Sequence, residues 1–508
     1  MQKRPSFLWR VVLSIAMAII LLGACTPRPV PGPEPTLSAT SQVHTIVPEP
    51  SHTPAPASTG TISDLTSPTP TSQLAVQNTQ YNLSAVMNYA QHTVEVDEQI
   101  LYVNRSSESI AELLLVVEPI YYPGVFDLKS LAWADGQAIQ PYAWDGSFLS
   151  FPIPDAIGPD QEIGLSLTYQ LQLPSPTPSA ETRPVPFGYT ARQANLVDWY
   201  PYIPPYQAGK GWLAHRAGFF GEHQVYEMAD FTVTIRIADQ RDDLILAASA
   251  PDEGASGIHQ YHLIDARNFV WSVSPEYVVK TKQVGDITIL GYSFGFHEVA
   301  GEAVLQTTAE ALELYSRLFA PYPHRQLSVV EADFLDGMEY EGLYFLSNGF
   351  YNLYQGTPAE YLVAIAAHET AHQWWYALVG NDQALEPWLD EALCTYSERI
   401  YYENLHPDAL DWWWEYRVNY YEPKGWVDGS IYNPDGYRAY RDAIYLNGAR
   451  FLEDLRNLIG DEAFMASLRD YAHQYTHRIA TTADFFRVVA EHSSADLTSL
   501  KKQYFSQP

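Results

Sequence analysis

Cysteine is the residue type that this sequence most nearly lacks. Only Cys25 and Cys394 occur among the 508 residues, which excludes a disulfide framework. Cys394 lies one turn after Glu391 in a helical pattern, so we interpret it as a small buried residue. The class of small, disulfide-stapled secreted domains is therefore ruled out.

Basic residues are also scarce. Lysine and arginine total 29 against 60 aspartates and glutamates, which gives a formal net charge of −31. A surface with this charge repels phosphate backbones, so nucleic acid is excluded as the main partner. The charge fits a soluble acidic surface and does not choose among other substrates.

The apolar run at residues 11–22 is too short to span a bilayer comfortably, but it suits the apolar region of a signal peptide. Basic residues precede it, and it ends in LGAC, which resembles the lipobox of bacterial lipoproteins. This resemblance implies a signal peptide at residues 1–24 and lipidation of Cys25. We therefore expect an exported protein, lipid-anchored on the extracytoplasmic side of a bacterial membrane. The alternative is an uncleaved signal anchor.

Apolar and aromatic residues are plentiful, at 46% and 14% of the chain, which predicts globular domains. The length favours two or three folded units. Residues 25–78 differ, because they are rich in proline, serine and threonine and cannot bury enough apolar surface to fold. They predict a disordered tether between the membrane and the folded part.

Residues 79–295 contain β-rich or alternating runs separated by turn clusters such as AWADGQ and PDEGASG. The runs are HTVEVDEQILYVN, AELLLVVEPI, FTVTIRI, NFVWSVS and ITILGYSF. They predict an N-terminal antiparallel, β-sandwich-like domain. From Glu302 onward the periodicity becomes helical, so we place a domain boundary near residue 295 and a mainly α domain at residues 296–505. No internal repeat is visible, which argues against a solenoid or propeller.

The segment GTPAEYLVAIAAHETAHQWWYALVGN has the start and stop signals of one long helix. Thr357, Pro358 and Glu360 suit an N-cap, a first helical residue and a capping-box glutamate. Gly380 and Asn381 are typical of residues just past a helix end. The histidines of this segment therefore lie on a predicted helix.

His368 and His372 are four residues apart, so their rings project from one helix face at a spacing that lets both bind one cation. A hydrolytic zinc site needs a third protein ligand and an open position for water. Glu391 is the best candidate, because Pro387 can start a second helix that packs back on the first. Glu369 can then lie beside the metal as general base and later general acid.

A second histidine pair tests how specific this pattern is. His473 and His477 have the same spacing, but Gln474 stands where the catalytic glutamate would be. We interpret that pair as an exposed helix face, since histidine pairs alone are weak indicators. The HETAH motif alone also leaves an ordinary helix open as the alternative.

HETAH, then eighteen residues, then Glu391 within WLDEAL resemble the gluzincin signature of the aminopeptidase N family of zinc metallopeptidases, which includes leukotriene hydrolase. The resemblance spans roughly residues 80 to 505. It implies a thermolysin-like catalytic domain with one zinc ion, held by His368, His372 and Glu391, and peptides as substrates.

DGMEYEGL, residues 336–343, resembles the family's G-x-M-E-N loop, in which Glu339 matches the glutamate that binds the substrate's free amino terminus. A carboxylate beside the zinc would bind the α-ammonium of a peptide and so direct cleavage to the first peptide bond. Asp336 replaces the usual glycine and Tyr340 the usual asparagine. These departures leave the amine anchor in place but put the shape of the first side-chain pocket in doubt.

IYLNGARFLEDL resembles the family's Y-x-K-G segment, in which Tyr445 matches the tyrosine that stabilises the tetrahedral intermediate. Asn447 stands in place of the lysine. NLVDWYPYIPPY is similar to a family segment ending in W-F-P, but no substrate-binding residue can be carried over from it. On the helix of Glu391, Glu398 could hydrogen-bond a ligating histidine, and solvent exposure is the alternative.

Larger family members add a helical C-terminal domain that has no counterpart here, so we expect a more open site with looser limits on peptide length. The sequence predicts a membrane-tethered zinc aminopeptidase with Glu369 and Tyr445 as catalytic residues and Glu339 as the substrate anchor. Two alternatives are a metallo-endopeptidase on the same scaffold and a lipoprotein that binds peptides without cutting them.

Overall fold

The computed structural model describes residues 78–175, 186–239, 241–433 and 435–507. The predicted signal peptide, Cys25 and nearly all of the predicted tether lie outside these ranges and stay predictions. Among the described residues, no helix combines the length and apolarity that crossing a membrane requires.

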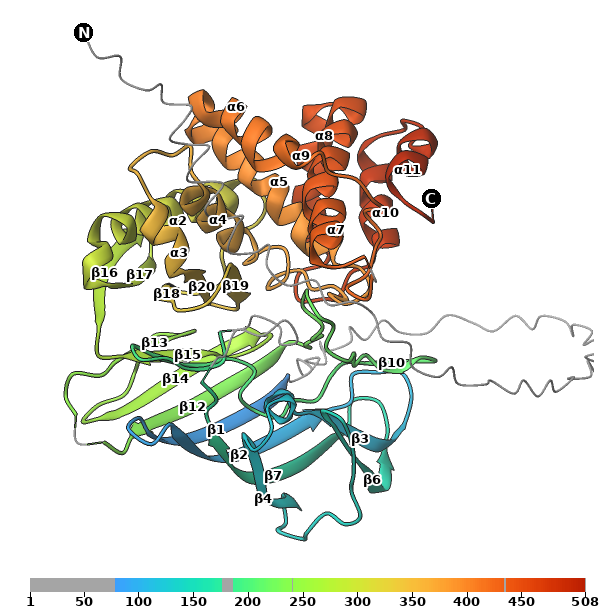
Figure 1. Cartoon of the computed structure of the whole chain (residues 1–508). Helices are drawn as coiled ribbons and strands as arrows, with labels where there is room; N and C mark the ends of the chain where they lie inside the picture. Colours follow the sequence, from blue (N-terminus) through green and yellow to red (C-terminus); the bar gives the residue numbers. More distant parts are fainter. Residues whose placement is uncertain (1–77, 176–185, 240, 434, 508) are drawn as a thin grey trace, which may run out of the picture. The chain divides into compact units, whose positions relative to one another are not determined.

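The first half of the described chain is built from strands, as its alternating runs predict (Figure 1). The largest sheet has six strands in the order β14-β12-β1-β2-β7-β4, antiparallel except for the parallel β1 and β12 pair. Side chains of β1 and β2 alternate between buried and more exposed, because only one sheet face meets the core. Its strands are β1 (Thr79–Asn88), β2 (Thr93–Val103), β4 (Phe126–Trp133), β7 (Glu162–Gln172), β12 (Ala229–Ile237) and β14 (Ile258–Ala266).

Smaller sheets complete the β-rich part. One contains β3 (Ile110–Val116), β6 (Phe148–Ile157) and β5 (Ala143–Asp145), with the short helix η1 (Glu118–Tyr121) following β3. Another contains β13 (Ile245–Ala248), β15 (Trp271–Ser274), β9 (Ala194–Leu196) and β8 (Gly188–Tyr189). The hairpin β10 (Tyr206–Gln207) and β11 (Gly211–Trp212) stands by itself.

A five-stranded mixed sheet underlies the helical part, in the order β16-β17-β18-β20-β19. Its strands are β16 (Tyr277–Val284), β17 (Ile287–Phe294), β18 (Gln326–Ala332), β19 (Gly337–Tyr340) and β20 (Leu343–Ser347). Every residue of β18 and β20 is buried, as expected for central strands covered on both faces. Since β17 pairs with β18, this sheet crosses position 295, near which the change of periodicity in the sequence predicts a domain boundary.

Helices form the rest of the chain. Those around the sheet are η2 (Gly295–His297), α2 (Glu298–Leu318), α3 (Asn348–Leu353), α4 (Tyr361–Ala371) and α5 (Trp388–Leu405). The following ones are η3 (Pro407–Ala409), α6 (Leu410–Trp412), the π-helix η4 (Trp413–Val418), η5 (Asn419–Tyr421), α7 (Tyr437–Arg441) and the π-helix η6 (Asp442–Asn447). The last are α8 (Gly448–Ile459), α9 (Asp461–Gln474), α10 (Thr482–His492) and α11 (Thr498–Tyr504).

The predicted long helix is shorter at both ends than expected. Glu360, not Thr357, is the N-cap of α4, because the Glu360 carboxylate accepts hydrogen bonds from the Gln355 backbone and the Thr357 hydroxyl and closes a turn there. At the other end α4 stops at Ala371, and Tyr376 adopts a φ of 130°. An α-helix needs a φ near −60°, so the helix cannot continue to Gly380. The prediction that a helix begins at Pro387 is confirmed by α5.

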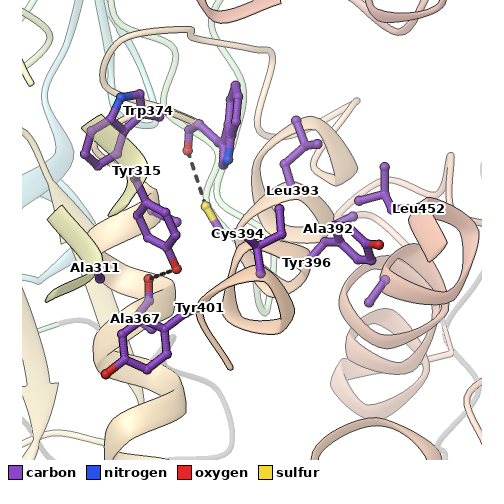
Figure 2. Close-up of a cluster of buried hydrophobic side chains, with 14 of the residues drawn as sticks. Ala311, Tyr315, Ala367, Trp374, Ala392, Leu393, Cys394, Tyr396, Tyr401 and Leu452 are labelled. Atoms are coloured by element: carbon purple, nitrogen blue, oxygen red, sulfur yellow. Dashed lines mark hydrogen bonds between the residues drawn. The ribbon is translucent and has the colours of Figure 1, made fainter. Parts of the chain in front are cut away.

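The core of the helical part fixes α4 against α5. In Figure 2, Tyr315 of α2 points toward Ala367 of α4, and its hydroxyl donates to that carbonyl at 3.3 Å and to the Ser397 carbonyl of α5 at 2.8 Å. Cys394 is fully buried, with its sulfur 3.7 Å from the Trp375 carbonyl, which confirms its interpretation as a core residue. The two helices are therefore rigid supports for any side chains that face the gap between them.

Candidate functional site

Two adjacent helices bring three potential metal ligands together. His368 on α4, His372 at the C-cap of α4 and Glu391 on α5 are buried, and their ligand atoms lie within 4.8 Å of one another. The Glu391 Oε2 atom is 3.2 Å from His368 Nε2 and 3.7 Å from His372 Nε2. Ligands of a tetrahedral zinc ion, at bonds of roughly 2.0–2.2 Å, lie about 3.4 Å apart. The donor set therefore fits zinc in both chemistry and spacing.

Hydrogen bonds behind the rings orient both histidines. His368 Nδ1 donates to Glu398 Oε1 at 2.9 Å, and His372 Nδ1 donates to Asp390 Oδ1 at 2.6 Å. With the proton on Nδ1, the Nε2 lone pair of each ring faces Glu391 and is available to a cation. Burial lowers the pKa of His368 to about 4, which keeps this imidazole neutral, the form that binds metals.

Glu398 lies at the centre of a charged network. Its side chain is 0% exposed, which removes the solvent-exposed alternative. It accepts hydrogen bonds from the Arg417 guanidinium at 2.9 and 2.7 Å and from the Trp413 indole at 2.8 Å. Burial alone would raise the pKa of Glu398, but the Arg417 charge and the His368 hydrogen bond outweigh it and hold the pKa below its usual value. A permanent carboxylate therefore supports His368.

Asp390 and Gln383 belong to the site, although no sequence pattern predicts a role for either. Gln383 Nε2 donates hydrogen bonds to Asp390 Oδ2 at 2.7 Å and to Glu339 Oε1 at 3.1 Å. This amide therefore links Asp390, which accepts from His372, to Glu339 on β19. The only sequence signal for Asp390 is its place beside Glu391. A histidine that binds a metal usually donates its other ring N–H to an acceptor, and a neighbouring carboxylate can serve as one. Gln383 lies in a turn and gave no signal.

Glu369 is placed for proton transfer next to the donor set. It is buried on α4, and among the described residues its Oε2 atom has no hydrogen-bond partner. Burial, reinforced by the nearby Glu339 and Asp336 charges, raises the pKa of Glu369 well above its usual value. Strand β19 runs closely past it, since a Cβ atom at Gly337 would lie 2.0 Å from Glu369 Oε1. A larger residue at this position of the strand would displace the Glu369 carboxylate.

Glu339 of β19 is brought to the same place. Burial raises its pKa to about 8, and the carboxylates of Glu222 and Asp390 act in the same direction while His372 opposes them. Glu222 was not predicted, yet its carboxylate lies within 4.8 Å of those of Glu339 and Glu391. Glu222 lies far along the chain from the recognised motifs, so no sequence pattern connects it with the site. These clustered carboxylates repel one another, so the site favours binding of a cation, such as a metal ion or an ammonium group.

Tyr445 faces the donor set from the π-helix η6. Its hydroxyl donates to Glu391 Oε1 at 2.5 Å, and its ring stacks on His368 with centroids 6.0 Å apart. Burial and the neighbouring Glu391 raise the pKa of Tyr445 well above its usual value, so the phenol keeps its proton. The structure thus brings together all the predicted site residues except Cys25, which lies outside the described residues.

The second histidine pair forms no such site. His473 is exposed on the last turn of α9, whereas His477 lies past the end of that helix with a φ of 62°. The two rings therefore do not share one helix face, and among the described residues the pair is absent from every cluster spaced to hold a metal.

A sheet flanked by helices, with one histidine on α4, a second at its C-cap and a glutamate on α5, has the two-histidine and one-glutamate donor set of a hydrolytic zinc site. Residues 303–504 match the sequence model of the Peptidase family M1 domain. This part of the chain is therefore similar to the domain that defines peptidase family M1.

Curated relatives and solved structures are also similar to this chain. Aminopeptidase M1-B of Oryza sativa subsp. japonica is 27% identical over 222 residues, which cover 41% of this chain and 25% of that protein. Aminopeptidase N of Lactococcus lactis subsp. lactis is 25% identical over 160 residues, which cover 28% of this chain and 18% of that protein. The chain thus spans a quarter or less of the length of these curated relatives. An M1 zinc metallopeptidase structure from Deinococcus radiodurans has a TM-score of 0.60 at 18% identity and covers 85% of this chain and 94% of that one, which shows a shared fold.

Proposed function

We propose that this protein is a zinc aminopeptidase that releases N-terminal residues from peptides. The observation that carries the proposal is the buried Oε2 atom of Glu369, which has no partner among the described residues, on a carboxylate that clusters with His372, one of the three potential metal ligands. A buried carboxylate oxygen without a partner is costly in a folded protein, and a proton-transfer role gives this oxygen a partner in the reacting complex.

Each residue has a role that follows from its position. His368, His372 and Glu391 would hold the zinc, which when bound polarises a peptide carbonyl and acidifies water. Glu369 would take the proton of the attacking water and return it to the leaving amine. Its raised pKa matches this exchange, because the carboxyl group can hold the proton between the two steps.

Tyr445 and Glu339 would act on opposite ends of the scissile residue. The protonated Tyr445 phenol can donate a hydrogen bond to the developing oxyanion. Glu339 can hold the substrate's α-ammonium, and this restricts cleavage to the first peptide bond. The relatives named above are aminopeptidases, and a variant of the Deinococcus enzyme binds the peptide Tyr-Ser-Ala. Both facts support a peptide substrate.

We also propose that the protein works outside the cytoplasm, tethered to a membrane through a lipid on Cys25. The support is the order of features in the sequence: basic residues, an apolar run, LGAC, and then a segment rich in proline, serine and threonine. Metabolic labelling with a fatty-acid analogue, compared between the natural chain and Cys25→Ser, tests this location. Equal labelling of the two proteins would contradict it.

A panel of aminoacyl fluorogenic substrates tests the activity. We expect release of the fluorophore, loss of activity with a chelator, and recovery on adding zinc. Glu369→Gln should abolish turnover while the protein still binds one zinc ion. The matched substrate control is an N-acetylated peptide. If it is cut as fast as its free-amine counterpart, the protein is an endopeptidase and Glu339 is not an amine anchor.

A further inference from the structure

A small cavity opens beside Glu339. It has a volume of about 10 Å³ and is lined by Met338, Glu339, Tyr340 and Tyr376, among other residues. A space of this size holds about one water molecule. In a peptide held by its α-ammonium at Glu339, the first side chain starts one carbon away from that nitrogen. The cavity therefore lies within reach of the first side chain.

Tyr340 is a fixed wall of this cavity. It is 4% exposed, and its strand β19 pairs with β20 through Leu343. Its carbonyl accepts a hydrogen bond from Gln373 Nε2 at 2.9 Å, and its ring packs edge-on against Phe345. Moving the phenol ring aside would disturb a packed hairpin and not merely one rotamer.

Tyr376 is an equally fixed wall from the segment after α4. It is 5% exposed, and its backbone carbonyl accepts a hydrogen bond from Arg267 Nε at 2.6 Å. Its hydroxyl accepts a hydrogen bond from the side chain of Asn268. Its φ of 130° is a strained value for a residue with a side chain, and it persists only where the surroundings hold the backbone in place.

We infer that this pocket restricts the enzyme to peptides with a small first residue, and that Tyr340 and Tyr376 set the limit. The inference rests on the proposed aminopeptidase function. A hydrogen atom, a methyl or a hydroxymethyl group is close in size to one water, so glycine, alanine and serine fit. Leucine and phenylalanine need several more carbon atoms, and the two fixed rings exclude them.

The charge of the pocket adds a second limit. Asp198, which accepts a hydrogen bond from the Tyr226 hydroxyl at 2.7 Å, and Glu222 also line the cavity. A first residue with a carboxylate would meet these like charges in a buried place. Aspartyl and glutamyl peptides are therefore the poorest substrates of all.

The test compares kcat/KM for aminoacyl arylamides of alanine, leucine, phenylalanine and glutamate, using the zinc-loaded full chain. We expect alanine to exceed leucine at least tenfold, because differences in pocket fit of this size change rates by about 10- to 200-fold. Tyr340→Asn should raise the leucine-to-alanine ratio at least tenfold, while Tyr340→Phe, which keeps the ring, should leave the ratio near that of the wild type. Met338→Ala opens the same cavity without touching the ring and should raise the ratio if Tyr340→Asn fails to fold.

The outcomes separate this inference from the function on which it rests. A wild-type enzyme that cleaves leucyl or phenylalanyl substrates as fast as alanyl ones would overturn the inference and leave the aminopeptidase proposal intact. An unchanged ratio in folded, active Tyr340→Asn and Met338→Ala proteins would do the same. If the zinc-loaded protein released no amino acid from any substrate, the proposed function and the inference would both fail.

Discussion

Replacing Glu398 by glutamine tests whether the network behind His368 sets the metal affinity of the site. The carboxylate is fully buried, accepts from His368 Nδ1 at 2.9 Å and pairs with Arg417. Glutamine keeps an oxygen for His368 but removes the negative charge that makes the imidazole a better donor to a cation. Loss of such a partner lowers metal affinity by about 10- to 100-fold. We expect the zinc dissociation constant to rise by this factor.

The same substitution also affects folding, through a different residue. Arg417 is buried, and Glu398 supplies both of its charge-assisted hydrogen bonds at 2.9 and 2.7 Å. Removing one partner of a buried ion pair costs about 3–5 kcal/mol, because the other charge stays buried without compensation. Glutamine still offers one acceptor, so we expect a loss near the lower end, about 3 kcal/mol, in the unfolding free energy of the metal-free protein.

A double variant separates these two effects. In Glu398→Gln with Arg417→Met, no uncompensated charge remains, so the unfolding free energy should recover by about 2 kcal/mol or more. Zinc affinity should stay low, because His368 still lacks a carboxylate. Urea unfolding of the metal-free proteins and zinc titration against a chromophoric chelator give the two quantities. Equal zinc affinity in the wild type and both variants would refute the reasoning.

Three further predictions follow from single contacts. Burial raises the pKa of Glu98, which is 1% exposed, well above its usual value, and the neighbouring Tyr169 hydroxyl offsets this shift only in part. The folded state thus favours the protonated form of Glu98. Below the unfolded pKa near 4.5 the protonated carboxyl makes its full contribution to the unfolding free energy. As the pH rises from there toward the folded pKa, this contribution falls by about 1.4 kcal/mol per pH unit. Glu98→Gln should therefore gain stability over the wild type in urea unfolding from pH 5 to 7, and a difference that does not change with pH would contradict this. Tyr445→Phe should lower kcat by about 100- to 1,000-fold with a smaller change in KM, and a changed KM alone would argue against a role in the transition state. Gly337→Ala should lose most activity while still binding zinc, because the added Cβ displaces the Glu369 carboxylate; full activity would show that β19 can move.

The sequence predicts the parts of this site that one local pattern specifies. A spacing of four residues on an apolar helix defines where His368 and His372 project, and Pro387 marks the start of the helix that carries Glu391. The resemblance to known metallopeptidases adds Glu339 and Tyr445, which come from separate elements and have no spacing rule of their own. The β-rich half is predictable because strands with one buried face alternate in burial.

Other parts of the site depend on contacts that no local pattern reports. Gln383 joins Asp390 to Glu339 only because a turn after α4 folds back over α5, and Glu222 arrives from the β-rich half of the chain. The end of α4 was predicted too late for a similar reason. The unusual backbone angle of Tyr376, past the end of α4, excludes a helix that continues to Gly380, and the Arg267 guanidinium and the Asn268 side chain, far away in the sequence, hold Tyr376 in place.

Asp336 shows how a departure from a family pattern can be explained by backbone geometry. It stands where the G-x-M-E-N loop has glycine, and its φ of 89° lies in the region that glycine adopts freely and other residues adopt at a cost. In this chain the aspartate carboxylate accepts hydrogen bonds from the Tyr437 hydroxyl at 3.0 Å and from the Gly337 backbone at 3.1 Å. These bonds offset the strain and tie the loop before β19 to α7. The conformation that places Gly337 against Glu369 is thus kept by side-chain hydrogen bonds where the family pattern relies on glycine.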